Sequence, residues 1–276
     1  MNHIKSNGRV QQSTDDHFNN YACGSISHRS ILVMEVFSNS ECPKNCPRCD
    51  RFPVRKRFPD YQFTPEMAIH LAEKLNEYDC VIENLQFIGG EPLLWKHFEK
   101  CIDILRMTEK IMSIKMFTAL IDGIDMRPFE SVFDVIGVTD YGTNRHLIER
   151  YALDNPMYVV FRTEKHDYHP RGRLPGTIPC DCGNINSWLF DKRVHFCSIA
   201  GPILMSNLDL KMSASEIDSY SWTLDDFLQN IEKCQSEFGS RNICEACHVN
   251  PNVKRIVGAA KVNVPGWFGD GIYEIR

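Results

Sequence analysis

The sequence predicts an α/β fold built on a mostly parallel sheet. From residue 31 to about residue 162, strand-like apolar runs alternate with segments of helical periodicity, which is the pattern of repeated β/α units. About five such units fit in this stretch, fewer than the eight that close a barrel. We therefore expect a partial (β/α) barrel with its functional side chains at the carboxyl ends of the strands. A small α+β domain, rich in cysteine, is expected to follow.

The helices and strands are expected in the following order. Thr64 followed by Pro65 is a helix start, and apolar residues at helical spacing continue this helix to about Tyr78. An apolar stripe predicts a second helix over residues 95–111, in which Cys101, like Cys80 before it, has an apolar context typical of a core thiol. Strands are expected over residues 31–37, 84–88, 114–120, 135–139 and 157–161, with short helices over 128–133 and 145–152.

Composition describes an ordinary globular protein. Of the 276 residues, 43% are hydrophobic and 24% are charged, and the net charge of -5 argues against nucleic acid as a partner. No apolar run reaches the roughly 18 to 20 residues of a membrane span, and residues 1–29 show no signal or transit peptide. We therefore expect a cytoplasmic protein without a membrane partner. Twelve cysteines in that reducing compartment favour metal ligation over disulfides.

A cysteine triplet directly follows the first strand. Cys42, Cys46 and Cys49 stand at C-x3-C-x2-C spacing, and three thiolates on one short loop can hold one metal centre. A structural zinc normally takes four protein ligands, so a zinc loop would need Cys80 or a histidine as the fourth. A centre held by three thiolates keeps one coordination position open for chemistry. The spacing alone leaves both interpretations open.

A glycine-rich turn follows the second strand. Gly89 and Gly90 allow the backbone to approach a ligand closely. Glu91 can accept hydrogen bonds from an ammonium group, and Pro92 stiffens the turn. Polar residues also follow the next two strands, Asp122 after the third and Asp140 with Tyr141 after the fourth. Such strand-end residues are candidates for ligand contact, although ordinary solvated loops contain them too.

A second set of candidate residues lies in the C-terminal third. An irregular segment carries Arg171 and Arg173, which could bind carboxylate, phosphate or hydroxyl groups. Residues 188–196 have the pattern of a β-hairpin, and residues 223–233 that of a helix. The cysteines of this region are Cys180, Cys182, Cys197, Cys244 and Cys247. By spacing alone, a four-cysteine zinc site is an alternative for them.

The cysteine triplet and the Gly-Gly-Glu-Pro turn, in this order after two strands, resemble the radical SAM superfamily. The resemblance implies that Cys42, Cys46 and Cys49 hold three irons of a four-iron four-sulfur cluster. The amino and carboxylate groups of S-adenosylmethionine (SAM) would then chelate the fourth iron. SAM contacts are implied for a set of residues at the strand ends, namely Gly89, Gly90, Glu91, Pro92 and Asp122. Arg48 stands where that superfamily usually has an aromatic residue.

The C-terminal cysteines are similar to the twitch subdomain of that superfamily, a short relative of the SPASM domain. The ligands of one auxiliary four-iron four-sulfur cluster would then be Cys180, Cys197, Cys244 and Cys247. Cys182 competes with Cys180 for the first ligand position. The expected division of the chain is an N-terminal tail over 1–29, the partial barrel over 30–165, the twitch domain over 166–252 and a C-terminal extension over 253–276.

The resemblance implies an enzyme that generates a 5′-deoxyadenosyl radical, which abstracts hydrogen from a small polar substrate. Length and layout are similar to the short members that dehydrogenate aminocyclitols in antibiotic biosynthesis. We expect dehydrogenation, with the auxiliary cluster as electron acceptor, or epimerisation, with a free cysteine as hydrogen donor. Outside the barrel helices the unassigned cysteines are Cys182, Cys23 and Cys234, and Cys182 is the candidate donor. Arg171 and Arg173 would contact a sugar or aminocyclitol-like substrate. A flavodoxin or ferredoxin would supply electrons. The alternatives are a radical SAM maturase that modifies peptides or proteins and a non-catalytic, zinc-binding relative.

Overall fold

The computed structural model describes residues 29–44, 55, 58–152, 154–162, 185–188, 193–195 and 221–236. The strands are β1 (Ser30–Phe37), β2 (Val81–Ile88), β3 (Ile114–Thr118), β4 (Val135–Asp140), β5 (Tyr158–Arg162), β6 (Ile185–Trp188), β7 (Arg193–His195) and β8 (Ser221–Thr223). In this described part they form one sheet in the order β5-β4-β3-β2-β1-β6-β7-β8. All neighbours from β5 to β6 are parallel, and the pairs β6–β7 and β7–β8 are antiparallel.

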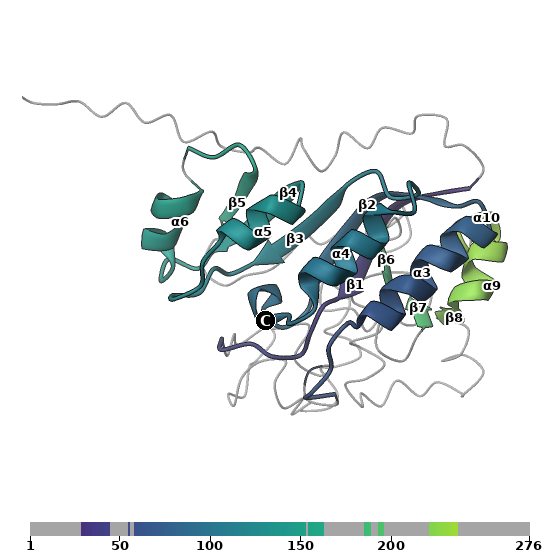
Figure 1. Cartoon of the computed structure of the whole chain (residues 1–276), viewed down its shortest axis with the longest axis horizontal. Coiled ribbons are helices and arrows are strands. Elements are labelled where there is room, and N and C mark those ends of the chain that lie inside the picture. Colours follow the sequence, from purple (N-terminus) through teal and green to yellow (C-terminus); the bar gives the residue numbers. More distant parts are fainter. Residues whose placement is uncertain are drawn as a thin grey trace, which may run out of the picture.

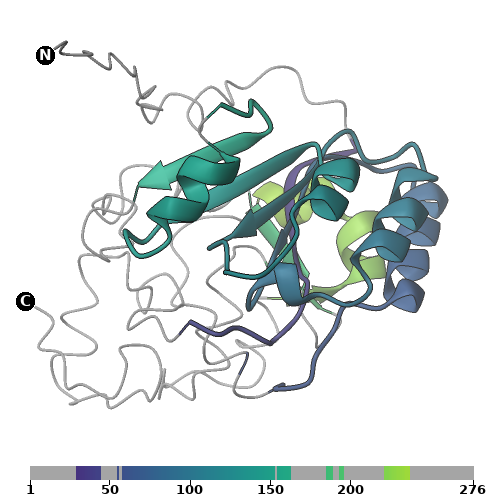
Figure 2. The ribbon, with the colours of Figure 1, turned by 60° about the vertical axis from the view of Figure 1, so that its left-hand side comes forward.

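Helical segments connect the five strands from β1 to β5. They are α3 (Pro65–Glu77), the 3-10 turn η1 (Pro92–Leu94), α4 (Phe98–Arg106), α5 (Arg127–Val132) and α6 (Arg145–Tyr151), followed after β8 by α9 (Leu224–Gln229) and α10 (Ile231–Ser236). Figure 1 shows α3, α4 and α5 in front of the sheet, and Figure 2 shows the same layers from another side. The sheet is open, so the expected α/β fold with a partial barrel is confirmed. No helix among the described residues combines the length and apolar character needed to cross a membrane.

The second barrel helix is shorter than predicted, because α4 covers residues 98–106 rather than 95–111. Trp95 has an extended backbone, with φ -75° and ψ 113°. Its indole is 2% exposed, and its Nε1 donates to the Phe63 carbonyl oxygen at 2.7 Å. Beyond Arg106 the chain turns, and Glu109 has a φ of 54° that no α-helix contains. The apolar stripe was therefore correct, but tertiary contacts set the helix ends.

The hairpin expected over residues 188–196 is confirmed, since Trp188 pairs with Val194 in antiparallel β6 and β7. β6 also pairs in parallel with β1, with Ile185 next to Val33. The C-terminal segment therefore extends the barrel sheet. The helix expected over 223–233 is interrupted at Asn230, whose φ of -119° and ψ of 33° end α9. The four-part division of the chain into domains stays a prediction.

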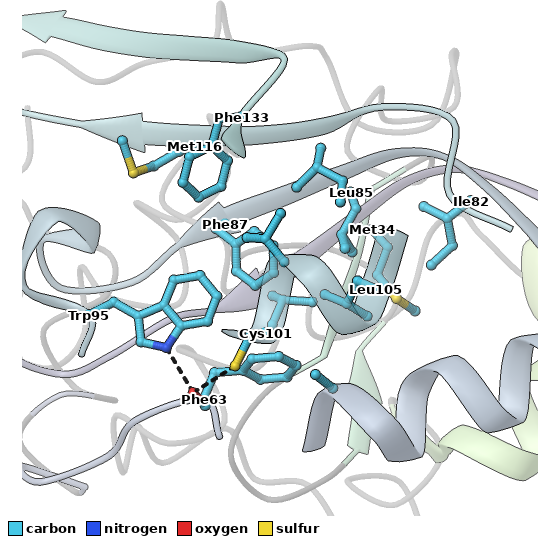
Figure 3. Packing of buried hydrophobic residues seen from close by; sticks show 14 of the residues in the cluster. Met34, Phe63, Ile82, Leu85, Phe87, Trp95, Cys101, Leu105, Met116 and Phe133 are labelled. Atoms are coloured by element: carbon cyan, nitrogen blue, oxygen red, sulfur yellow. Dashed lines mark hydrogen bonds between the residues drawn. The ribbon is translucent and has the colours of Figure 1, made fainter. Parts of the chain in front are cut away.

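The main core lies between the sheet and its helices (Figure 3). Strand residues Phe87 and Leu85 pack with Leu105 of α4, and all three are fully buried. The rings of Phe87 and Trp95 stack with their centroids 4.6 Å apart. Cys80 and Cys101 are buried thiols, as expected, and burial raises the pKa of both to about 12. These two cysteines are therefore structural.

The core geometry predicts a large cost for truncating Phe87, which is 0% exposed and lies against Trp95. Phe87→Ala should lower the free energy of unfolding by about 3–5 kcal/mol, because it removes the contacts and leaves a cavity. Urea denaturation followed by circular dichroism would measure this loss. The control is Ile69→Ala at a residue on α3 that is 43% exposed, and it should change stability by no more than about 0.5 kcal/mol. Equal effects of both changes would contradict this description of the core.

Candidate functional site

Main-chain hydrogen bonds join the carboxyl ends of β1 and β2 beyond the strands themselves. The Ser38 amide donates to the Ile88 carbonyl oxygen, the Gly90 amide to that of Asn39 and the Glu91 amide to that of Glu41, each at 2.7 Å. Cys42 is the next residue after Glu41. The first cysteine of the triplet therefore lies beside the Gly-Gly-Glu-Pro turn, although the two motifs are far apart in sequence.

The two glycines permit this close contact. A Cβ atom on Gly90 would lie 2.1 Å from the Glu41 carbonyl oxygen, and one on Gly89 would lie 2.7 Å from that of Asn39. Gly89 also has a φ of +144°, which side chains disfavour. Any side chain at these positions would push the cysteine segment away from the turn. The sequence argument was that the two glycines allow close approach to a ligand. The structure shows that they allow close approach to the start of the cysteine loop, and their contact with a ligand stays a prediction.

The cysteine loop leaves and rejoins the sheet at the same place. Asn39 and Gln62 form an antiparallel bridge, and the Phe63 amide donates to the Ser38 carbonyl oxygen at 2.7 Å. Arg55 crosses the loop, because its guanidinium donates to the Ser40 carbonyl oxygen at 2.9 Å and to that of Cys42 at 3.1 Å. These bonds fix the direction in which the chain leaves the sheet at Cys42.

Glu91 is buried and hydrogen-bonded within the protein. It is 1% exposed, and its Oε1 accepts from the Thr118 hydroxyl and the Leu93 amide, while its Oε2 accepts from the Ala119 amide. Burial raises the pKa of Glu91, whereas these hydrogen bonds and the nearby Lys44 ammonium lower it. A carboxylate has about four acceptor positions, and these donors use three. Glu91 thus connects the ends of β2 and β3, and one of its acceptor positions has no donor among the described residues.

The carboxyl end of β4 is also connected to this site, through Asn144 and Lys44. Asn144 is 2% exposed and donates to the carbonyl oxygens of Ala119 and Thr139, and its Oδ1 accepts from the Tyr141 amide. The Lys44 Nζ lies 5.2 Å from the centre of the Tyr141 ring, within the range of a cation–π contact. Lys44, from the cysteine loop, thereby brings the ends of β1 and β4 together.

Three residues of this site, namely Asn39, Thr118 and Asn144, were not identified from the sequence. Asn39 donates to the Glu91 carbonyl oxygen at 2.9 Å, and Thr118 and Asn144 make the contacts described above. All three are polar and nearly inaccessible to solvent. Two of them stand at a strand end or directly beyond one, the position used to select Asp122, so the same signal could have identified them. Asn144 precedes a helix and has the pattern of an ordinary helix start.

Asp122 lies in the loop beyond β3. Its side chain is exposed and pairs with His146 at 2.8 Å. The implied SAM contact of Asp122 stays a prediction. The other residues singled out in the sequence as cluster ligands, substrate contacts or departures from the motif lie outside the described residues. They are Arg48, Cys46, Cys49, Arg171, Arg173, Cys180, Cys182, Cys197, Cys244 and Cys247. Among the described residues, no three metal-binding side chains of the His, Cys, Asp and Glu types lie together, and Cys42 is the one described member of the triplet.

The close contact at Gly90 predicts the effect of a single methyl group. Gly90→Ala would force the start of the cysteine loop to move, because the Glu41 carbonyl oxygen occupies the place of the new Cβ. We expect a loss of about 1–3 kcal/mol in stability and a severalfold loss of iron bound per chain after anaerobic reconstitution. Gly123→Ala is the control, because a Cβ there would have nothing within 4 Å while the φ of +82° still strains a side chain. It should lose some stability through backbone strain and bind the same amount of iron as the wild type. Normal iron binding in Gly90→Ala would contradict the role given to the close contact.

Comparison with known proteins gives similarities of two kinds. Residues 32–134, which contain both motifs, match the model of a 4Fe-4S single cluster domain. A structure of selenomethionine BtrN in an open conformation is similar with 16% identity and a TM-score of 0.48, covering 80% of this chain and 91% of that one. A structure of BtrN in complex with AdoMet and 2-DOIA is similar with 15% identity and a TM-score of 0.49, covering 89% and 98%. The search of curated proteins returned no significant match.

Proposed function

We propose that this protein is a radical SAM enzyme. The observation that carries the proposal is the main-chain connection of Glu41 to Glu91 and of Asn39 to Gly90, which makes one site of the cysteine triplet and the glycine turn. The match of residues 32–134 to a 4Fe-4S single cluster domain supports the proposal, because that stretch contains both motifs.

The residues present fit such a cofactor. Cys42 is partly accessible at the carboxyl end of the sheet, and with Cys46 and Cys49 it would hold three irons of a cluster. The Gly89–Gly90 backbone holds the start of the cysteine loop against the turn. Among the described residues, Glu91 has donors for three of its acceptor positions, and a fourth would suit an ammonium group. When bound to the cluster and reduced by one electron, SAM supplies the organic radical that removes hydrogen from a C–H bond.

The protein's own part in this chemistry is to fix the loop and the turn. Glu91 connects β2 to β3 through Thr118 and Ala119, and Asn144 extends the connection to β4. Pro92 begins the 3-10 turn and restricts the backbone after Glu91. A reactive radical requires a positioned substrate, and strand ends that are fixed by these hydrogen bonds serve that purpose.

The proposal extends to a small polar substrate, of the sugar or aminocyclitol class, that is dehydrogenated or epimerised. Cys180, Cys197, Cys244 and Cys247 would hold an auxiliary four-iron four-sulfur cluster that accepts the second electron of a dehydrogenation. Arg171 and Arg173 would bind substrate hydroxyl groups, Cys182 is the candidate hydrogen donor of an epimerase, and Asp122 would contact SAM. A flavodoxin or ferredoxin would supply the first electron.

Replacing the first cysteine tests the central assignment. Cys42→Ala should abolish the formation of 5′-deoxyadenosine from SAM under reducing conditions, because the cluster would lose one of three ligands. Chromatography of the reaction mixture would measure the product. Cys101→Ala, at a buried thiol in the core, is the matched control and should keep the activity. If Cys42→Ala cleaves SAM at the wild-type rate, the assignment is wrong.

Metal analysis tests the second cysteine group. After anaerobic reconstitution the protein should contain about eight irons per chain, since each four-iron cluster contributes about four. About four irons together with one zinc would show that the C-terminal cysteines form a structural zinc site. That outcome would remove the electron-accepting role while leaving the SAM-binding cluster in place.

The fate of hydrogen distinguishes the two reactions. In heavy water, a dehydrogenase should give a carbonyl product with no deuterium at the oxidised carbon, because the hydrogen and a second electron have both left it. An epimerase should give an inverted carbon that carries deuterium from an exchanged thiol. Mass spectrometry of the product separates these results, and the absence of both products from every sugar or aminocyclitol offered would exclude that substrate class.

A further inference from the structure

Three polar residues interrupt the apolar runs of the central strands: Glu35 in β1, Gln86 in β2 and Lys115 in β3. Each stands between two apolar neighbours that are 0% exposed, namely Met34 and Val36, Leu85 and Phe87, and Ile114 and Met116. Those neighbours belong to the core that packs with α3 and α4 (Figure 3). Because side chains alternate along a strand, the three polar residues lie on the opposite face of the sheet.

The three residues are direct neighbours across the strands. Glu35 is aligned with Gln86, and Gln86 is aligned with Lys115. Aligned residues of parallel strands project from the same face, and adjacent strands are about 4.8 Å apart. Glu35, Gln86 and Lys115, called here the polar row, therefore span about 10 Å across the sheet. This span suits one six-membered ring with its substituents.

Gln86 is a mostly buried residue whose carboxamide has no partner among the described residues. The residue is 6% exposed, its side-chain oxygen and nitrogen make no hydrogen bond there, and neither atom is among the fully buried atoms that lack a partner. The carboxamide therefore remains accessible to a ligand from this face of the sheet. Glu35, at 8% exposure, differs because it has contacts of its own, so the argument rests on Gln86 and Lys115.

Lys115 is partly buried and, among the described residues, has no ion pair or hydrogen bond for its ammonium. Burial lowers its pKa, and the nearby Asp134 carboxylate raises it. Asp134 is already engaged, because it accepts from Arg106 at 2.9 Å and from the Ile114 amide at 2.7 Å. A parallel sheet normally has apolar residues in the middle of its strands. The partly buried Lys115 ammonium is thus a cost that the fold does not require, and the accessible Gln86 amide lies next to it.

We propose that the polar row recognises the substrate, and that the substrate is a small ring with several hydroxyl groups. The Lys115 ammonium would donate to hydroxyl oxygens, and the Gln86 carboxamide would both donate and accept. This inference rests on the proposed function, because Gln86 precedes Gly89 by three residues on β2, below the proposed SAM site.

A recognition role and a structural role predict opposite effects on stability. If the row were structural, replacing its polar groups would weaken the protein. If it binds a ligand, a replacement of similar volume removes a group that has no partner among the described residues, so the ligand-free protein should be at least about equally stable while binding is lost.

The test uses Gln86→Met and Lys115→Met in the full chain, with Lys100→Met, at an exposed lysine of α4, as the matched control. Isothermal titration in the presence of SAM would measure binding of glucosamine, myo-inositol and cyclohexanol, and circular dichroism would measure thermal unfolding. We expect the wild type to bind one of the hydroxyl-rich rings and not cyclohexanol. Each variant of the row should lose at least tenfold in affinity without a lower unfolding midpoint, and the control should match the wild type.

Several results would overturn the proposal: wild-type affinity in both variants of the row, a clearly lower unfolding midpoint in both, or a wild type that binds neither hydroxyl-rich ring. Cleavage of SAM by the wild-type protein is measured separately. If the wild type cleaves SAM but the variants bind the ring normally, the polar row fails and the proposed function stands. If ring binding depends on the row but SAM is never cleaved, the row stands and the proposed function fails.

Discussion

The site depends on the absence of a side chain at Gly90. Only with hydrogen at that position can the Glu41 carbonyl oxygen approach closely enough for the Glu91 amide to bind it. This bond extends the pairing of β1 and β2 beyond the regular strands and places Cys42 beside the turn. The buried Glu91 carboxylate then connects the turn to β3, and Asn144 connects β3 to β4. The absence of a side chain at Gly90 is therefore the condition on which this series of strand-end contacts depends.

Glu91 and Asn144 differ from Gln86 and Lys115 in their hydrogen-bond partners. At the carboxyl ends of the strands, Glu91 and Asn144 are inaccessible to solvent and each has several partners, as expected for groups that hold a fixed geometry. In the middle of the strands, Gln86 and Lys115 have no such partners among the described residues. The first kind of group stabilises the fold, and the second kind is tolerated by it.

The sequence predicted the succession of strands and helices from residue 31 to about residue 162 and placed both motifs directly after strands, because periodicity and strand-end position are local properties. It did not predict the ends of α4, since Trp95 leaves the helical conformation to place its indole against Phe63. It did not predict that Glu91 would be occupied by Thr118 and Ala119, because these donors come from another strand. Nor did it predict that β6 would continue the barrel sheet. Contacts between segments distant in sequence decide these features.

The position of β6 has a consequence for how the chain can be divided. β1 has β2 on one side and β6 on the other, and its partner Ile185 is separated from Val33 by most of the barrel sequence. Pairing over such a separation slows folding. A fragment that ends at residue 165 would leave β1, which is almost wholly apolar, as an unprotected edge open to pairing with another chain. The barrel segment is therefore a poor unit for separate expression, and the hairpin after it serves as the cover of its first strand.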